Sequence, residues 1–183
     1  MNIILDMDET LIGAQFAVHS ENLPFFDNAK PYIITTCQIH ERPFLDVFFE
    51  YVFNKFERVS IWTHGTTEWY NTCYEYVLKK YIPKGKHFYK VITRDNNILP
   101  FENDLSKPLH KFYMLCPYHN ENNTFILDDY KEVKKTQPKN CISIHPFFFT
   151  KKNSQNDKVL LNLIPYLSEI NKDGRNKIGK EDL

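Results

Sequence analysis

Short apolar runs alternate with longer amphipathic segments along this chain of 183 residues. The short runs are rich in Ile, Val, Phe and Tyr, a composition that is typical of strands. They predict strands at Asn2–Leu5, Tyr32–Cys37, Arg58–Thr63, Tyr89–Thr93, Thr124–Leu127 and Asn140–Ile144.

Three other segments carry apolar residues at helical spacing: Pro43–Phe56, Glu68–Tyr81 and Lys158–Ile170, the last interrupted by Pro165. Strands that alternate with helices are typical of βαβ units, so we expect an α/β fold with a central parallel sheet flanked by helices. No repeat or internal linker divides the chain. The pattern predicts one domain over residues 1–171 and a polar C-terminal tail over residues 172–183.

The first and the fifth predicted strands each end in a pair of acidic residues. Asp6 and Asp8 follow the first strand, and Asp128 and Asp129 follow the fifth. Ligands of open parallel sheets bind outside the carboxyl ends of the strands, where two such ends can lie side by side. Either pair alone could equally be a solvated acidic loop. Carboxylates this close repel one another unless a cation lies between them. Because hard divalent cations prefer oxygen ligands, the pattern predicts a Mg²⁺ site at this edge.

The third predicted strand ends in a hydroxyl side chain, Thr63, which is followed by His64 and Gly65. Glycine lets the backbone approach a ligand closely, and a hydroxyl with exposed N–H groups suits phosphate oxygens. Thr and Gly also end many strands that bind nothing, so a plain strand end is the alternative. Trp62 and Trp69 nearby are predicted to be core residues rather than platforms for a ligand.

Lys+Arg and Asp+Glu both number 23, so the formal charge is zero and gives no overall attraction to nucleic acid or an anionic membrane. The chain has neither a signal-peptide pattern nor an apolar stretch of about 18 residues. Its four cysteines form no CxxC pair, which predicts reduced, buried thiols. We expect a cytoplasmic or nuclear protein. Its many Asn, Lys, Phe, Tyr and Ile residues point to a viral or other AT-rich source.

The opening DMDET resembles the DxDxT signature of haloacid dehalogenase superfamily phosphatases. Four further segments resemble one branch of that superfamily, the RNA polymerase II C-terminal-domain phosphatases and the small NLI-interacting-factor-like phosphatases. In chain order these segments are ERPFLDVFFEYVFNKFERVSIWTHG, NDLSKPL, ILDD and DKVLLNLIPYL. The resemblance covers residues 1–171 and implies a haloacid dehalogenase-like Rossmannoid fold.

The resemblance implies a phosphatase mechanism on the first motif. Asp6 would be the nucleophile that attacks phosphorus and forms an aspartyl-phosphate. Asp8 would be the general acid for the leaving alkoxide and then the general base for water, and its backbone carbonyl would bind Mg²⁺. Thr10 would brace this loop by a hydrogen bond.

The remaining implied roles fall on the other strand ends. Thr63 would hold the phosphoryl oxygens as charge develops. Asp129 is expected to bind the metal directly, with Asp128 supporting or ligating. His64 is a candidate substrate contact or an ordinary loop residue. Arg94 lies where relatives place a substrate-contacting arginine, and an ordinary solvated arginine is its alternative.

The lysine is where this sequence departs from its relatives. Their phosphate-stabilising lysine precedes Asp-Leu-Ser, and Asn103 stands at that position here. Lys107 follows one helical turn later and is our candidate. However, Pro108 disfavours a helical conformation for the residue before it. Lys111 is the alternative candidate, and the absence of any such lysine would indicate a weak or inactive enzyme.

The segments between motifs are short. Residues 12–41 are too few for more than a short hairpin or loop, and residues 65–102 leave room for little beyond one helix and a strand, so we expect no large cap domain. An open site suits a macromolecule. The predicted function is therefore a Mg²⁺-dependent protein phosphoserine/phosphothreonine phosphatase, with a substrate like the polymerase C-terminal tail. The alternatives are a phosphatase of nucleic-acid ends or small metabolites, and a weak or inactive binding module.

Overall fold

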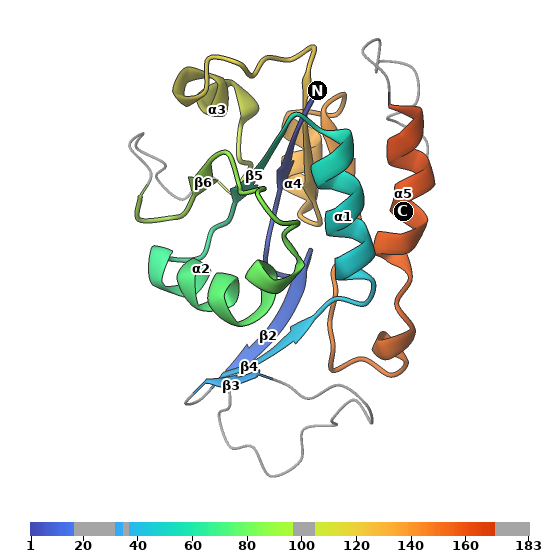
Figure 1. Cartoon of the computed structure of the whole chain (residues 1–183). Coiled ribbons are helices and arrows are strands. Elements are labelled where there is room, and N and C mark those ends of the chain that lie inside the picture. The colour runs from blue at the N-terminus through green and yellow to red at the C-terminus, as the bar shows by residue number, and fades with distance from the viewer. Residues whose placement is uncertain (17–31, 35–36, 97–104, 171–183) are drawn as a thin grey trace.

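The computed structural model describes residues 1–16, 32–34, 37–96 and 105–170, and Figure 1 shows their helices and strands. Five parallel strands form the central sheet in the order β6-β5-β1-β7-β8. Their bounds are β1 Asn2–Leu5, β5 Arg58–Trp62, β6 Val91–Ile92, β7 Thr124–Asp128 and β8 Cys141–Ser143. The predicted parallel sheet is confirmed. The predicted tail, residues 172–183, lies outside the described residues.

Helices lie on both faces of this sheet because alternate strand residues point to opposite sides. Ile3 of β1 packs in a core cluster with α1 (Leu45–Lys55), α2 (Thr67–Cys73) and α5 (Val159–Glu169). Ile4 packs in a second cluster with the two helices of the opposite face, α3 (Leu109–Leu115) and α4 (Lys131–Thr136). The central strand is therefore covered on both faces, as its continuous apolar sequence predicts.

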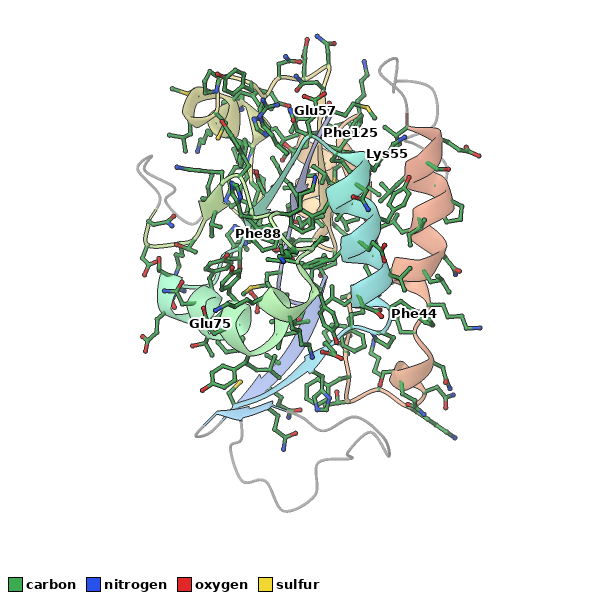
Figure 2. The ribbon with its side chains drawn as sticks, in the orientation of Figure 1. Phe44, Lys55, Glu57, Glu75, Phe88 and Phe125 are labelled. Carbon is green, nitrogen blue, oxygen red and sulfur yellow. The ribbon has the colours of Figure 1, made fainter. Side chains whose placement is uncertain are left out.

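The larger core is aromatic. Phe88, labelled in Figure 2, lies against two rings of α1, with centroid distances of 5.9 Å to Phe49 and 5.5 Å to Phe53. α1 and α5 lie side by side (Figure 1). These contacts belong to the core that covers one face of the central sheet.

A second, antiparallel sheet was not predicted. Its strands are β2 Ile12–Phe16, β3 Tyr32–Ile34 and β4 Cys37–Glu41, in the order β2-β4-β3. The single strand predicted over Tyr32–Cys37 is therefore wrong, and the described part of residues 12–41 forms more than a hairpin. Glycine is uncommon inside strands, so Gly13 weakens the strand pattern of β2. Its lack of a side chain allows close packing, since a Cβ there would lie 3.0 Å from the Phe149 ring.

The helical segments also differ from prediction. The segment predicted over Glu68–Tyr81 begins as α2 and continues as a π-helical turn η1, Tyr74–Leu78, and a 3₁₀ turn η2, Lys79–Tyr81. A further 3₁₀ turn, η3, spans Ser154–Asn156. Neither α3 nor α4 was predicted, because both are short; Val133 is the one buried residue of α4.

Candidate active site

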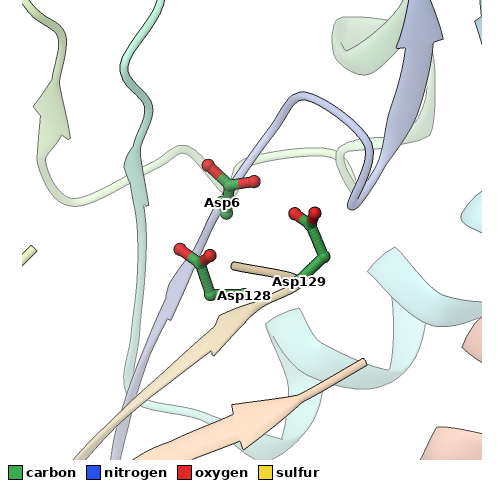
Figure 3. Close-up of side chains that lie close together, drawn as sticks. All are labelled: Asp6, Asp128 and Asp129. Atoms are coloured by element: carbon green, nitrogen blue, oxygen red, sulfur yellow. The ribbon is translucent and has the colours of Figure 1, made fainter. Parts of the chain in front are cut away.

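Three carboxylates meet at the carboxyl edge of the central sheet. β1 and β7 pair in register, so Asp6 follows one strand while Asp128 ends its neighbour. The Asp6 N–H donates to the Leu127 carbonyl over 2.9 Å, which keeps the two chains adjacent past the end of β1. One carboxylate oxygen each of Asp6, Asp128 and Asp129 lies within 4.8 Å of the others (Figure 3). The structure thus brings Asp6, from the first acidic pair, together with both aspartates of the second pair.

Burial and repulsion from neighbouring carboxylates make Asp128 and Asp129 difficult to ionise. Burial, with the charges of Asp6 and Asp128, raises the pKa of Asp129 to about 7. Burial likewise raises the pKa of Asp128 to about 6, although Lys107 opposes the shift. A cluster of oxygen donors with excess negative charge fits a hard divalent cation, so the residues present suit Mg²⁺. Asp6, Asp128 and Asp129 would hold it.

The two aspartates at the end of β7 are bonded differently. Asp128 accepts hydrogen bonds on both oxygens, from Lys107 Nζ at 2.7 Å and from the Tyr130 N–H at 2.9 Å. Asp129 accepts one from the Thr10 hydroxyl at 3.0 Å and is the more exposed of the two. This difference favours Asp129 as a direct metal ligand. The Thr10 hydroxyl joins the first motif to Asp129, whereas the prediction was that it braces its own loop.

Lys107 reaches this cluster from the loop that precedes α3. Its ammonium is buried and pairs with both Asp6 and Asp128. Burial alone would lower the lysine pKa, but attraction to the two acids raises it above its ordinary value. Asn103 lies outside the described residues, and Lys111 lies on α3.

The backbone explains how Lys107 reaches the cluster despite the following proline. Lys107 adopts a left-handed conformation with φ 43°, so it belongs to no helical turn. Gln137, just after α4, clamps this loop: its Nε2 donates to the Ser106 and Lys107 carbonyls at 3.1 and 3.3 Å, and its Oε1 accepts the Leu109 N–H. A residue from another element therefore sets the position of the lysine.

Asp8 lies beside the acidic cluster and is held by two side-chain donors. Its Oδ1 accepts the indole N–H of Trp69 at 2.7 Å, and its Oδ2 accepts the Thr63 hydroxyl at 2.9 Å. The Thr63 oxygen in turn accepts the Gly65 N–H at 2.9 Å. Burial, and then repulsion from Asp6, raises the pKa of Asp8. Such a carboxyl is suited to carrying a proton.

The indole of Trp69 was predicted as core only. Its ring does pack against the larger core, but its N–H also reaches the first motif. No spacing rule could connect it to Asp8. Trp62 is buried in the core on the opposite face of the sheet, against Phe112.

Arg42 is a second residue whose part in the site was missed. The side chain of Arg42 is fully buried. Its guanidinium donates to the Thr10 carbonyl at 3.1 Å and to the His145 carbonyl at 2.9 Å. It also forms an ion pair with Asp157 at 3.0 Å. Arg42 thus ties the loop after β1 to the segment before α5. The Arg-Pro pair in the sequence was the available signal.

His64 and Arg94 lie on neighbouring loops. His64 follows Thr63 and is half-buried, and Arg94 follows β6 with an exposed side chain. The Arg94 N–H donates to the Gly65 carbonyl at 2.9 Å, which joins the two loops. Their contact with substrate stays a prediction.

Comparison with known proteins identifies relatives over nearly the whole chain. A family model described as NLI interacting factor-like phosphatase matches residues 1–177. The CTD phosphatase-like protein 355R of Invertebrate iridescent virus 6 is 32% identical over 180 residues, covering 88% of this chain and 94% of that protein. Protein 355R of Invertebrate iridescent virus 3 is 27% identical over 173 residues, covering 87% and 90% respectively. Both of these relatives are viral, as expected for the source.

Two solved structures share the fold. Fcp1, described as an essential RNA polymerase II CTD phosphatase, matches 90% of this chain with a TM-score of 0.59 and 19% identity. A fission yeast Fcp1 variant bound to beryllium fluoride gives a TM-score of 0.57, also at 19% identity and over 90% of this chain. The chain spans about half of those structures, 49% in each case.

In the described part of the chain, no helix has the length and apolarity to cross a bilayer.

Proposed function

Since the chain belongs to the NLI interacting factor-like phosphatase family and is a phosphatase of the haloacid dehalogenase type, we propose that it hydrolyses phosphomonoesters. In this proposal the reaction requires Mg²⁺ and proceeds through an aspartyl-phosphate on Asp6. The observation that carries the proposal is the convergence of Asp6, Asp128 and Asp129, with Asp8 close enough to Asp6 for their charges to repel. Bound Mg²⁺ would supply positive charge that offsets the acids and the phosphate dianion.

Asp6 is the nucleophile. Its carboxylate attacks phosphorus, the new P–O bond forms to Asp6, and the bond to the substrate oxygen breaks. The ion pair with Lys107 orients this carboxylate and keeps a positive charge near the transferring phosphoryl group. While Asp8 carries its proton, the Thr63 hydroxyl donates to a phosphoryl oxygen instead of to Asp8, together with nearby backbone N–H groups. The loop contacts of Arg42 and Thr10 keep the first motif in place.

Asp8 moves the protons. It gives a proton to the leaving oxygen in the first step, then accepts one from the water that hydrolyses the aspartyl-phosphate. Its raised pKa keeps the protonated form accessible. The two carboxyls, Asp6 and Asp8, thus divide nucleophilic and acid–base work between them.

The proposed substrate is a phosphoserine or phosphothreonine on an extended protein segment, such as a polymerase C-terminal tail. In the described residues between β5 and β6, only α2 and the η1 and η2 turns intervene, so little protein is available there to cover the site. The names of the relatives support the same substrate class. The binding-only alternative depended on Asn103, and the position of Lys107 beside Asp6 argues against it.

The test is hydrolysis of p-nitrophenyl phosphate with Mg²⁺, with EDTA, and by Asp6→Asn. Asp46→Asn, the same change at an exposed position on α1, is the matched control. We expect turnover that requires Mg²⁺, vanishes in Asp6→Asn and persists in Asp46→Asn. Turnover retained by Asp6→Asn would remove the nucleophile, and no turnover under any condition would favour the binding module. Phosphopeptides assayed against phosphorylated oligonucleotides would then identify the substrate class.

A further inference from the structure

We propose that Trp69 is a positioning residue that fixes which oxygen of Asp8 carries the transferred proton. This inference rests on the proposed function, in which Asp8 is the general acid. It concerns a contact between residues 61 positions apart, made at 2.7 Å from the indole Nε1 to Asp8 Oδ1.

The indole is held in place by the start of α2. The Thr66 hydroxyl accepts the Trp69 backbone N–H at 3.1 Å and caps the helix. Gly65 allows the ring to pack closely, since a Cβ there would lie 2.5 Å from an atom of the Trp69 ring. The ring also packs against the larger core. The N–H direction is therefore set by backbone, glycine and core together.

The two donors that face Asp8 are chemically unequal. An indole N–H can only donate, and the unprotonated oxygen of a carboxylic acid accepts more strongly than its O–H oxygen, so the indole favours an unprotonated Oδ1. A hydroxyl can donate or accept, so Thr63 tolerates either a proton or a lone pair on Oδ2. The proton that Asp8 delivers is consequently carried on Oδ2.

The transfer balances with no further reactant. As the bond from phosphorus to the substrate oxygen breaks, its electron pair stays on that oxygen, which takes the proton from Asp8 Oδ2. The resulting Asp8 carboxylate accepts hydrogen bonds on both oxygens, from Trp69 and Thr63. Without the indole N–H, the Asp8 carboxyl can rotate and place its proton away from the leaving oxygen.

Leaving-group dependence separates this role from simple packing. A poor leaving group needs its proton during bond cleavage, whereas p-nitrophenolate needs little assistance. Phenyl phosphate has a leaving group about as basic as a tyrosine side chain, with a pKa of about 10. The quantity to measure is kcat/KM at one fixed pH with saturating Mg²⁺, because it reports the steps up to the first phosphoryl transfer.

We expect Trp69→Phe to lose about 10–100-fold more activity on phenyl phosphate than on p-nitrophenyl phosphate, part of the roughly 10²–10⁴-fold that a positioned acid contributes. Replacement of Trp69 by 3-benzothienylalanine, which keeps the bicyclic shape but has sulfur in place of the N–H, should show the same selective loss. Trp62→Phe, the same change at the chain's other tryptophan, should keep the wild-type ratio of the two substrates.

Equal losses on both substrates in the Trp69→Phe and benzothienylalanine proteins would overturn the inference while leaving the proposed function intact. A wild-type protein without Mg²⁺-dependent, Asp6-dependent turnover would overturn the proposed function, and this inference with it. If Trp69→Phe does not fold, the benzothienylalanine protein decides the question alone.

Discussion

Replacing Lys107 with methionine removes a buried cation and keeps an unbranched side chain of similar length. The side chain of Lys107 is 2% exposed, and those of its partners Asp6 and Asp128 are 8% and 1% exposed, so water screens these pairs little. Removing one partner of a buried ion pair costs about 3–5 kcal/mol. At about 2–4 °C per kcal/mol for a domain of this size, Tm of the metal-free Lys107→Met protein should fall by about 6–20 °C.

The loss should depend on pH and on Mg²⁺. It should be greatest above pH 7 and shrink below about pH 6, where Asp128 takes up a proton more readily. Added Mg²⁺ should restore most of the Tm, because it offsets the same carboxylates. It should not restore kcat, which we expect to be about 10²–10³-fold lower, because the charge that Lys107 directs at the transferring phosphoryl group is lost.

The assay is thermal unfolding in EDTA and in excess Mg²⁺, with p-nitrophenyl phosphate turnover measured on the same samples. Lys111→Met, on α3, is the comparison because Lys111 was the alternative lysine. A Lys107→Met protein with wild-type Tm in EDTA and full activity would refute the ion-pair reasoning. Loss of kcat in Lys111→Met instead would show that the lysine has been assigned wrongly.

Three further predictions follow from other residues. Burial lowers the pKa of His119 from 6.5 to about 4, so the unfolded chain binds more protons than the folded chain between these pH values. The free energy of unfolding should therefore fall by up to about 3 kcal/mol as pH drops from 6.5 to 4. Urea unfolding of His119→Phe should show a flatter dependence of stability on pH, and parallel pH profiles for the two proteins would contradict this. Asp157→Asn should lower the free energy of unfolding by about 2–3 kcal/mol, because it leaves the fully buried Arg42 without its carboxylate. Glu75→Gln, in an exposed ion pair, should change stability little. Equal melting curves for the two variants would count against the role of Arg42. Above pH 7, Asp129→Asn should raise the Tm of the metal-free protein, because it removes a buried carboxylate whose pKa is raised to about 7 and whose charge destabilises the fold. The same change should weaken Mg²⁺ binding measured by calorimetry. Unchanged Mg²⁺ affinity would exclude Asp129 as a ligand.

The sequence was most informative where one local signal determined the structure. The apolar run at Asn2–Leu5 is buried on both faces, and its end fixes the position of Asp6. The same holds for β7 and its two aspartates. Strand direction then brings both acidic pairs to one edge, because parallel strands end on the same side. The sheet and the meeting of the acids were therefore predictable before any contact was seen.

The rest depended on contacts between distant residues. Lys107 reaches Asp6 through a left-handed backbone that Gln137 clamps from another element, and helical spacing could not predict this. Trp69 reaches Asp8 with its ring packed closely over Gly65, a contact between distant parts of the sequence. The second sheet needed pairing between β2 and β4, which a short strand containing glycine does not indicate by itself.

The central claim is that Asp6 becomes phosphorylated, and direct identification of the phosphorylated residue tests it. The protein would be mixed with p-nitrophenyl phosphate and Mg²⁺, quenched within one turnover, reduced with borohydride and sequenced by mass spectrometry. Borohydride converts an aspartyl-phosphate to homoserine, so the account predicts homoserine at position 6, and its absence from the EDTA sample and from Asp6→Asn. Homoserine at another aspartate, or phosphate released by active enzyme with Asp6 unmodified under every quench time, would contradict it.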